Sequence, residues 1–326
     1  LQRESTELIT SRVILNANNT LIEKTQDPVL IDYQIYLINN IINTARLSSG
    51  MFGNTGHADD YLGWIEFADG VEKPLYESYP FVFIAKFLYM MQQSGWKDQN
   101  EENKQWWEST LKFVEEQEWE KWGKRSYYKY STFIRTRTYM GSHWATIAMY
   151  LKEMSKDQNR IAEYIEVQTI FDTLLKRNLK LNPNHANAYI WNGSWDDVSG
   201  VGVEGITPAN VELQDVGHAN HVVNYIISAY EKGEPSWTLV DIQRLCNTAK
   251  DIIYSYEDNN FVRNIDGTDI ELDNGSSAYG NVGDGWVKLS KYDPGVEAVM
   301  KRFTQNNAKY LYLYQPIHFS AFFYGR

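Results

Sequence analysis

The stretch YPFVFIAKFLYMMQQSG, residues 79–95, is apolar around most of a helical surface. A helix of this kind needs packing partners on several sides, so the stretch predicts a buried helix. VLIDYQIYLINNIINTARL, residues 29–47, has the same character. In contrast, NEENKQWWESTLKFVEEQEWEKW, residues 100–122, is amphipathic and indicates an outer helix.

This succession of apolar and more polar helices, joined by short polar links, continues along the chain. Helices are predicted over residues 4–17, 28–48, 79–95, 101–120, 140–155, 157–180, 218–232, 237–257 and 295–309. Such a pattern is typical of stacked helical hairpins, whereas βαβ units alternate strands with helices. We therefore expect an all-α fold, an α/α barrel or incomplete toroid of helical hairpins, forming a single catalytic domain over residues 1–326.

Charge and composition argue against several classes of protein. The net charge of −11 opposes general nucleic-acid binding. No apolar run reaches the roughly 18 residues of a membrane span, and the lone Cys246 permits no internal disulfide. We expect a monomer that is secreted or periplasmic in a bacterium, although no signal peptide is visible in the chain.

Aromatic content is the unusual feature of the composition. The chain contains 11 Trp, 23 Tyr and 13 Phe residues, or 14% aromatic residues. Flat apolar faces with polar edges suit sugar rings. The aromatic residues therefore indicate either a carbohydrate groove or a bulky aromatic core.

Three long stretches without a helical pattern, residues 50–77, 181–217 and 258–294, interrupt the helices. Loops of this length in a compact domain usually carry function. Directly after the second stretch, an apolar helix begins with His218, Asn220 and His221.

The two histidines lie on one face of this helix, because they are three residues apart. Three interpretations are open. They are structural groups bound to backbone or carboxylates, or a metal pair with a distant third ligand, or proton-transfer and substrate-binding groups at a pocket.

A basic stretch, KWGKRSYYKYSTFIRTR, residues 121–137, contains six basic residues and no acidic one. If its end is extended, Arg135, Arg137 and Tyr139 share one face at period-2 spacing, and His143 follows near the start of the next helix. The stretch is either a solvated loop that balances the acidic helix before it or a binding surface for an anionic ligand.

Two further loops contain candidate side chains. NHANAYIWNGSWDD, residues 184–197, contains Tyr189, Asn192 and Trp195 as substrate-binding candidates. YGNVGDGWVKLSKYDPGVEAVM, residues 279–300, contributes Tyr279, Trp286 and Tyr292. Upstream, DGTDIELDNG, residues 266–275, is a loose calcium-like run of acids that lacks the EF-hand spacing.

The segments GHANHVV, NNFVRNIDGTD and DGWVKLSKYD resemble those of α/α-barrel polysaccharide lyases, particularly lyases that cut alginate or glucuronan. The resemblance covers roughly the last third of the chain. It implies a lyase that uses a tyrosine, a histidine and an asparagine or arginine, without a redox cofactor. The matching residue types are Tyr292, His218 and His221, with Asn192 and Arg137 after them.

The chemistry of β-elimination fits these residue types. The enzyme must neutralise a uronate carboxylate, remove the adjacent C5 proton and protonate the departing O4 oxygen. A tyrosine, whose pKa is ordinarily about 10, needs nearby positive charge to act as the base. Tyr292 is the first choice because Lys288 and Lys291 are near it in sequence, and Tyr139 is the second.

The sequence thus predicts a lyase whose substrate is an anionic, uronic-acid-containing polysaccharide and which uses no cofactor. The expected catalytic residues are Tyr292, His218, His221 and Tyr139. The expected substrate-binding residues are Arg135, Arg137, His143, Tyr189, Asn192, Trp195, Asn220, Tyr279 and Trp286. Two alternatives remain: an α/α-barrel glycoside hydrolase that uses acids such as Asp196 or Glu204, and a non-catalytic glycan-binding protein.

Overall fold

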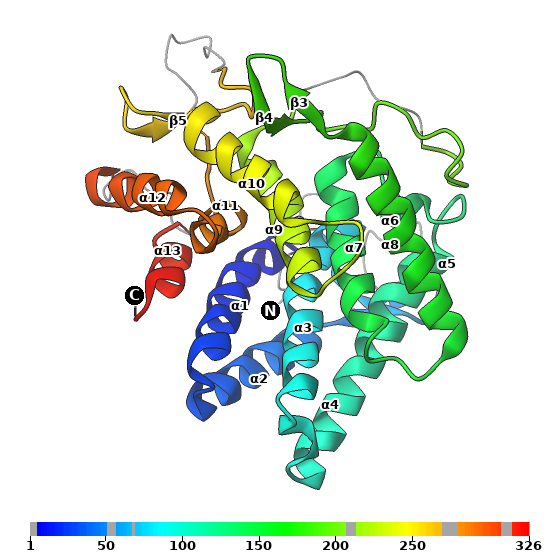
Figure 1. Cartoon of the computed structure of the whole chain (residues 1–326). Coiled ribbons are helices and arrows are strands. Elements are labelled where there is room, and N and C mark those ends of the chain that lie inside the picture. The colour runs from blue at the N-terminus through cyan, green and yellow to red at the C-terminus, as the bar shows by residue number, and fades with distance from the viewer. Residues whose placement is uncertain are drawn as a thin grey trace. The chain divides into compact units, whose positions relative to one another are not determined.

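The protein is mostly helical, as the sequence predicts (Figure 1). The computed structural model describes residues 5–50, 57–66, 69–206, 213–268, 280–307 and 315–325. Its contacts divide the chain into two compact units. The first unit is Leu1–Phe133 with Thr146–Val167, and the second is Ile134–Ala145 with Gln168–Arg326. The expectation of one catalytic domain did not distinguish these units.

The first unit is built mainly from helices. Its elements are α1 (Ser5–Thr25), α2 (Pro28–Ile42), β1 (Arg46–Leu47), η1 (Ser48–Gly50), β2 (Leu62–Gly63), α3 (Pro74–Gln93), η2 (Trp96–Asp98), α4 (Glu101–Phe113), the π-helical segment η3 (Val114–Glu120) and α5 (Lys121–Lys124). The short helix α6 (Ser131–Ile134) and the longer helices α7 (Thr138–Leu151) and α8 (Gln158–Asn178) each contribute residues to both units.

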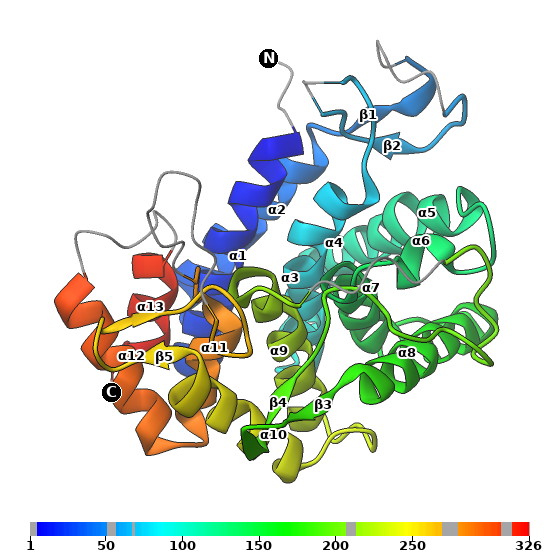
Figure 2. The same ribbon diagram turned by 90° about the horizontal axis from the view of Figure 1, so that it is seen from above.

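Helix α3 is the buried helix that its apolar sequence predicts. Phe81, Ile84 and Phe87 are wholly buried. The helix lies beside α1 (Figure 2), where Asn19 Nδ2 donates to the Phe83 carbonyl at 2.9 Å. An aromatic helix surface of this kind is stable only when neighbouring helices cover it, so α3 forms the centre of the first unit.

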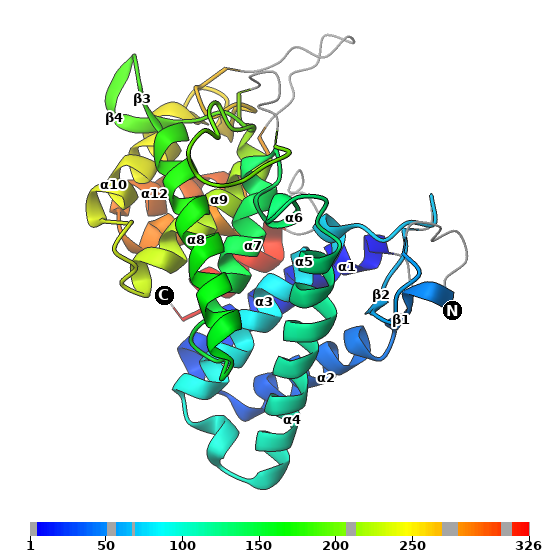
Figure 3. The same cartoon turned by 90° about the vertical axis from the view of Figure 1, so that its right-hand side faces the viewer.

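The second unit surrounds helix α9 (Val216–Glu231). Its other elements are β3 (Lys180–Asn182), β4 (His185–Ile190), α10 (Leu239–Asn247), the π-helical turn η4 (Thr248–Ile252), β5 (Tyr254–Ser255), β6 (Asn260–Phe261), α11 (Asp284–Lys288), η5 (Leu289–Lys291), α12 (Pro294–Asn307) and α13 (Gln315–Phe323). The antiparallel β3–β4 hairpin packs against α10 (Figure 3), and α11 packs against α9. Among the described residues, no helix is long and apolar enough to cross a membrane.

Each predicted helical segment overlaps a helix of the structure, although several boundaries differ. Helix α7 begins at Thr138 rather than at residue 140, and α3 begins at Pro74 rather than at residue 79. The predicted loop 181–217 contains strand β4, and the predicted loop 258–294 contains α11 and η5. Short elements of this kind carry too few residues for a periodic signal.

Core packing accounts for the high tryptophan content of the chain. Nine of the 11 are buried, and the remaining two, Trp96 and Trp106, are partly buried. Phe171 contacts both Trp195 and Tyr225 edge to face in the second unit. The aromatic content therefore reflects a bulky core and gives no support to a tryptophan-lined carbohydrate groove.

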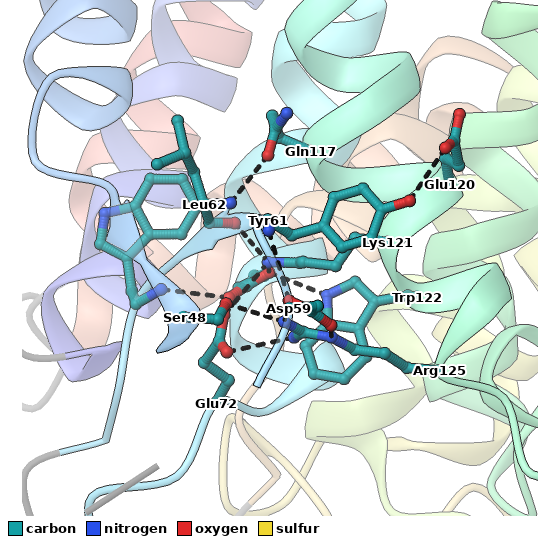
Figure 4. A network of polar contacts seen from close by, with 12 residues as sticks. Ser48, Asp59, Tyr61, Leu62, Glu72, Gln117, Glu120, Lys121, Trp122 and Arg125 are labelled. Atoms are coloured by element: carbon teal, nitrogen blue, oxygen red, sulfur yellow. Dashed lines mark hydrogen bonds and ion pairs between the residues drawn. The ribbon is translucent and has the colours of Figure 1, made fainter. Parts of the chain in front are cut away.

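A buried network of charged side chains connects α5 with the loop around β2 in the first unit (Figure 4). Lys121 Nζ donates to Glu77 Oε2 at 2.5 Å and to the Leu62 carbonyl at 2.9 Å. Arg125 binds Asp59 at 2.7 Å and Glu72 at 3.1 Å. The side chains of Lys121, Glu72 and Glu77 are completely buried.

This network changes the interpretation of the basic stretch 121–137. Four of its six basic residues pair with carboxylates: Lys121 with Glu77, Lys124 with Glu120, Arg125 with Asp59 and Lys129 with Glu166. The positive charge of these residues is therefore neutralised within the protein. Most of the positive charge of the stretch is thus compensated, and a binding surface for an anionic ligand in this stretch stays a prediction.

We predict that Lys121→Met lowers the free energy of unfolding by about 3–5 kcal/mol, because it leaves Glu77 buried without its cation. Chemical denaturation near neutral pH measures the loss. Lys124→Met is the matched control, since its partner Glu120 and its own side chain are partly exposed, and it should cost about 1 kcal/mol or less. Equal losses in the two variants would contradict this role for the buried pair.

Candidate functional site

The candidate site lies where helix α9 begins in the second unit. The segment before the helix is anchored on two sides: Gln214 N donates to the Trp191 carbonyl at 3.1 Å, and Val216 N donates to the Arg263 carbonyl at 2.7 Å. Asp215 then caps the helix, because its Oδ1 accepts the backbone N–H of His218 at 2.9 Å. Its other oxygen, Oδ2, lies 2.7 Å from His218 Nδ1.

The start of helix α7 is bonded to the same cap. Thr138 Oγ1 donates to Gln214 Oε1 at 2.9 Å, and Gln214 Nε2 donates to Asp215 Oδ2 at 3.2 Å. Thr138 N also donates to the Gly193 carbonyl at 2.8 Å. Both Thr138 and Gln214 are buried. These bonds fix the first turn of α7, which carries Tyr139, beside the first turn of α9.

Four rings from the two helices form a cluster, which we call the histidine–tyrosine cluster: Tyr139 and His143 from α7, and His218 and His221 from α9. The Tyr139 ring centroid lies 4.2 Å from that of His218 and 6.2 Å from that of His221. His143 contacts His221 edge to face at 4.5 Å.

The cluster extends from the surface into the unit. The His218 side chain is 48% exposed, His221 is partly buried, and Tyr139 and His143 are buried. A ligand can therefore reach His218 from solvent, and the Tyr139 ring lies directly beside this histidine. Three imidazoles, the side chains best suited to proton transfer near neutral pH, and one phenol are thus gathered at one partly open position.

Arg135 lies close to this cluster, but not in the way that its sequence spacing suggested. A shared face for Arg135, Arg137 and Tyr139 required an extended segment, and this condition is not met, because Arg135 has a left-handed backbone (φ 56°) and α7 already begins at Thr138. Arg137 forms an isolated antiparallel bridge with Ser194. Burial lowers the pKa of Arg135 from its ordinary value, and the neighbouring Tyr139 opposes that shift.

Several predicted binding residues instead hold the surrounding structure together. Trp195 and Trp286 are buried, and their ring N–H groups donate to the carbonyls of Arg135 at 2.7 Å and of Val216 at 3.0 Å. Tyr189 is buried as well, and its hydroxyl donates to Asp241 at 2.7 Å. These contacts place the three rings in the packing around the site rather than on a surface that a sugar can contact.

Asn220 has a structural role of the same kind. Its side chain donates to the Asn281 carbonyl at 2.9 Å and accepts the Gly283 N–H at 2.8 Å. A Cβ at Gly285 would lie 2.1 Å from the Asn220 carbonyl oxygen, so only glycine permits this approach of α11 to α9. Asn192 donates to Asp196 Oδ1 at 2.6 Å.

Tyr292 lies at the other end of α9 from the cluster. Its hydroxyl donates to Glu231 Oε1 at 2.7 Å, and 13 residues of helix from His218 to Glu231 span roughly 20 Å. Burial, and then the Glu231 carboxylate, raise the pKa of Tyr292 well above its ordinary value. Lys291 does lie 5.6 Å from the Tyr292 ring centroid, but it is paired with the same Glu231 at 2.7 Å, and the surroundings as a whole oppose the phenolate.

Two predictions cannot be assigned to the described site: the residues of the loop before α11, and a metal site. Tyr279 and the acids at positions 269, 271 and 273 lie outside the described residues. Within the described ranges, no group of three or more His, Cys, Asp or Glu residues is arranged to hold a metal ion.

Sequence reasoning missed the supporting groups Thr138, Gln214 and Asp215 as parts of the site. Asp215 caps the helix, and a cap residue three positions before a histidine can also bind that histidine with its second oxygen. This spacing was a usable signal. The contact of Thr138 with Gln214 spans 76 residues of sequence and left no local signal.

Comparisons of the chain with protein-family models, curated proteins and solved structures found no match. The case for a function therefore rests on the chemistry of the histidine–tyrosine cluster.

We predict that His218→Ala and His221→Ala each lower the turnover of a polyuronate at least about 100-fold, because each removes a group placed for proton transfer or charge stabilisation. Steady-state rates measure the effect, and circular dichroism checks the fold. His185→Ala is the matched control, since His185 lies in β4 beside Asp251 at 3.6 Å. Near-normal rates in both cluster variants would show that His218 and His221 have only a structural role.

Proposed function

We propose that this protein is a lyase that cleaves a uronic-acid-containing polysaccharide by β-elimination. The observation that carries the proposal is the contact of Tyr139 with His218 and His221. A tyrosine next to groups that carry or accept positive charge is the arrangement that a phenolic base requires.

The reaction divides into steps that these residues can perform. A histidine or Arg135 neutralises the uronate carboxylate, which makes the neighbouring C5 proton more acidic. The Tyr139 oxygen then removes that proton, the electron pair forms the C4=C5 double bond, and the C4–O4 bond breaks. The departing O4 oxygen takes a proton from the same phenol, which restores the base.

Tyr139 replaces Tyr292 as the proposed base. Tyr139 is within ring contact of two histidines, whereas Tyr292 is bonded to a carboxylate. Negative charge beside a phenol opposes its ionisation, and positive charge favours it. The Glu231 carboxylate beside Tyr292 therefore favours the second choice of the sequence over the first.

No comparable observation supports the glycoside hydrolase or the non-catalytic glycan-binding protein. Asp196, a candidate hydrolase acid, is paired with Lys180 and bonded to Asn192, and Glu204 is exposed. A glycan-binding platform of tryptophans would need exposed tryptophan faces, yet most tryptophans belong to the core. We also propose that the helical hairpins form an α/α barrel or an incomplete toroid, and that the protein acts as a secreted or periplasmic monomer without a cofactor.

We predict that incubation with alginate or glucuronan raises the ultraviolet absorbance in proportion to the new reducing ends, because elimination leaves a conjugated C4=C5 double bond. A panel of polyuronates, with a neutral glucan as the control polymer, makes the measurement. Reducing ends without absorbance would show hydrolysis instead. Binding without either product would show a glycan-binding protein.

We predict that Tyr139→Phe lowers kcat at least about 100-fold while the fold is retained, because the change removes one oxygen and keeps the buried ring. Tyr292→Phe is the matched control and should keep most of the activity. If Tyr292→Phe is inactive and Tyr139→Phe is active, the base has been assigned to the wrong end of α9.

A further inference from the structure

We propose that Asp215 is a positioning residue that holds the neutral His218 ring protonated on Nδ1, and so leaves Nε2 as the nitrogen that exchanges a proton or hydrogen bond with the substrate. The catalytic half of this inference rests on the proposed function. The structural half concerns the protein alone and can be tested without a substrate.

The two oxygens of the Asp215 carboxylate have separate tasks. Oδ1 accepts the backbone N–H of His218 at 2.9 Å, while Oδ2 lies 2.7 Å from the Nδ1 atom of the same residue. A carboxylate can only accept hydrogen bonds. The nitrogen that faces it therefore carries the hydrogen, and in a neutral ring the other nitrogen keeps the lone pair.

Asp215 is charged at neutral pH, as this role requires. Burial acts to raise the pKa of Asp215, but the hydrogen bonds and charge of His218 outweigh burial, so that the pKa lies below its ordinary value. The carboxylate is also held in place by Gln214 Nε2 at 3.2 Å, and Gln214 is itself held by Thr138. The acceptor thus has a fixed position in front of the His218 ring.

The His218 ring is fixed on a second side by its contact with Tyr139, whose centroid lies 4.2 Å away at an interplanar angle of 33°. A half-turn flip of the ring would break the bond to Asp215, and rotation of the ring out of its plane would also break the contact with Tyr139. Because the side chain is still 48% exposed, the nitrogen remote from Asp215 is the one available to a ligand. Nδ1, which faces Asp215, thus fixes the tautomer, while Nε2 is the nitrogen that meets the substrate.

Asp215→Asn tests this role without removing the helix cap. Asparagine caps helices about as well as aspartate, and its carbonyl oxygen can still accept the backbone N–H of His218. Its amide group, a donor, then faces Nδ1. A donor in this position requires Nδ1 to accept, so the hydrogen of the neutral ring must move to Nε2.

The measurement is nitrogen-15 NMR of the full chain labelled at histidine, at mildly alkaline pH where imidazoles are neutral. The His218 signals are assigned with a His218→Gln variant. We expect Nδ1 to be the protonated nitrogen in the wild-type protein and Nε2 in Asp215→Asn. On a cleaved polyuronate, Asp215→Asn should lower kcat at least about 100-fold and leave KM within about twofold, as expected when a catalytic histidine adopts the wrong tautomer.

Asp27→Asn is the matched control. Asp27 caps α2 by accepting the Val29 N–H at 2.9 Å, so this variant makes the same substitution at a helix cap outside the cluster. It should change neither the His218 tautomer nor kcat.

Two results would overturn the proposal. Retention of the Nδ1-protonated ring in Asp215→Asn would show that Asp215 only caps the helix. A change of tautomer with unchanged kcat would show that the tautomer does not matter for turnover. If no polyuronate is cleaved by the wild-type protein, the proposed function fails, while the NMR comparison still decides whether Asp215 controls His218.

Discussion

The carboxylate of Asp215 is the constraint on which the candidate site depends. It begins helix α9, binds the His218 ring and, through Gln214, joins the first residue of α7. Isolated helices leave their first N–H groups without partners, so a cap is needed in any case. Here the capping group also aligns the two helices that supply the histidine–tyrosine cluster, because its second oxygen is available for side-chain contacts.

Both units bury several polar and charged groups together with specific partners. In the first unit, the completely buried Lys121 is bonded to Glu77 and to a backbone carbonyl. In the second unit, Asn220 bonds the loop before α11 to the first turn of α9. Burying these groups is costly unless each finds a partner, so the partners fix how neighbouring elements pack.

Two signals from composition had structural rather than functional causes. The tryptophans fill the core, and most cations of the basic stretch pair with carboxylates, some of them far along the chain. Arg125 pairs with Asp59, which lies 66 residues away in the sequence. Composition records how many aromatic and charged residues exist, but not which of them face solvent. That question depends on contacts between distant segments.

The sequence by itself determined the helical character of the protein, the buried nature of α3, and the position of His218 and His221 on one helix face. These features follow from local periodicity and capping, which act within a few turns of the chain. The prediction of a buried helix for residues 29–47 holds only in part, because α2 exposes Val29, Tyr33 and Tyr36. Only the tertiary structure decided that Tyr139, and not Tyr292, accompanies the two histidines. His218 and Tyr139 are 79 positions apart and meet because Thr138 and Gln214 bond the helix starts together, whereas Glu231 binds Tyr292 at the opposite end of α9. No local pattern encodes such a choice, because it arises from the packing of whole elements.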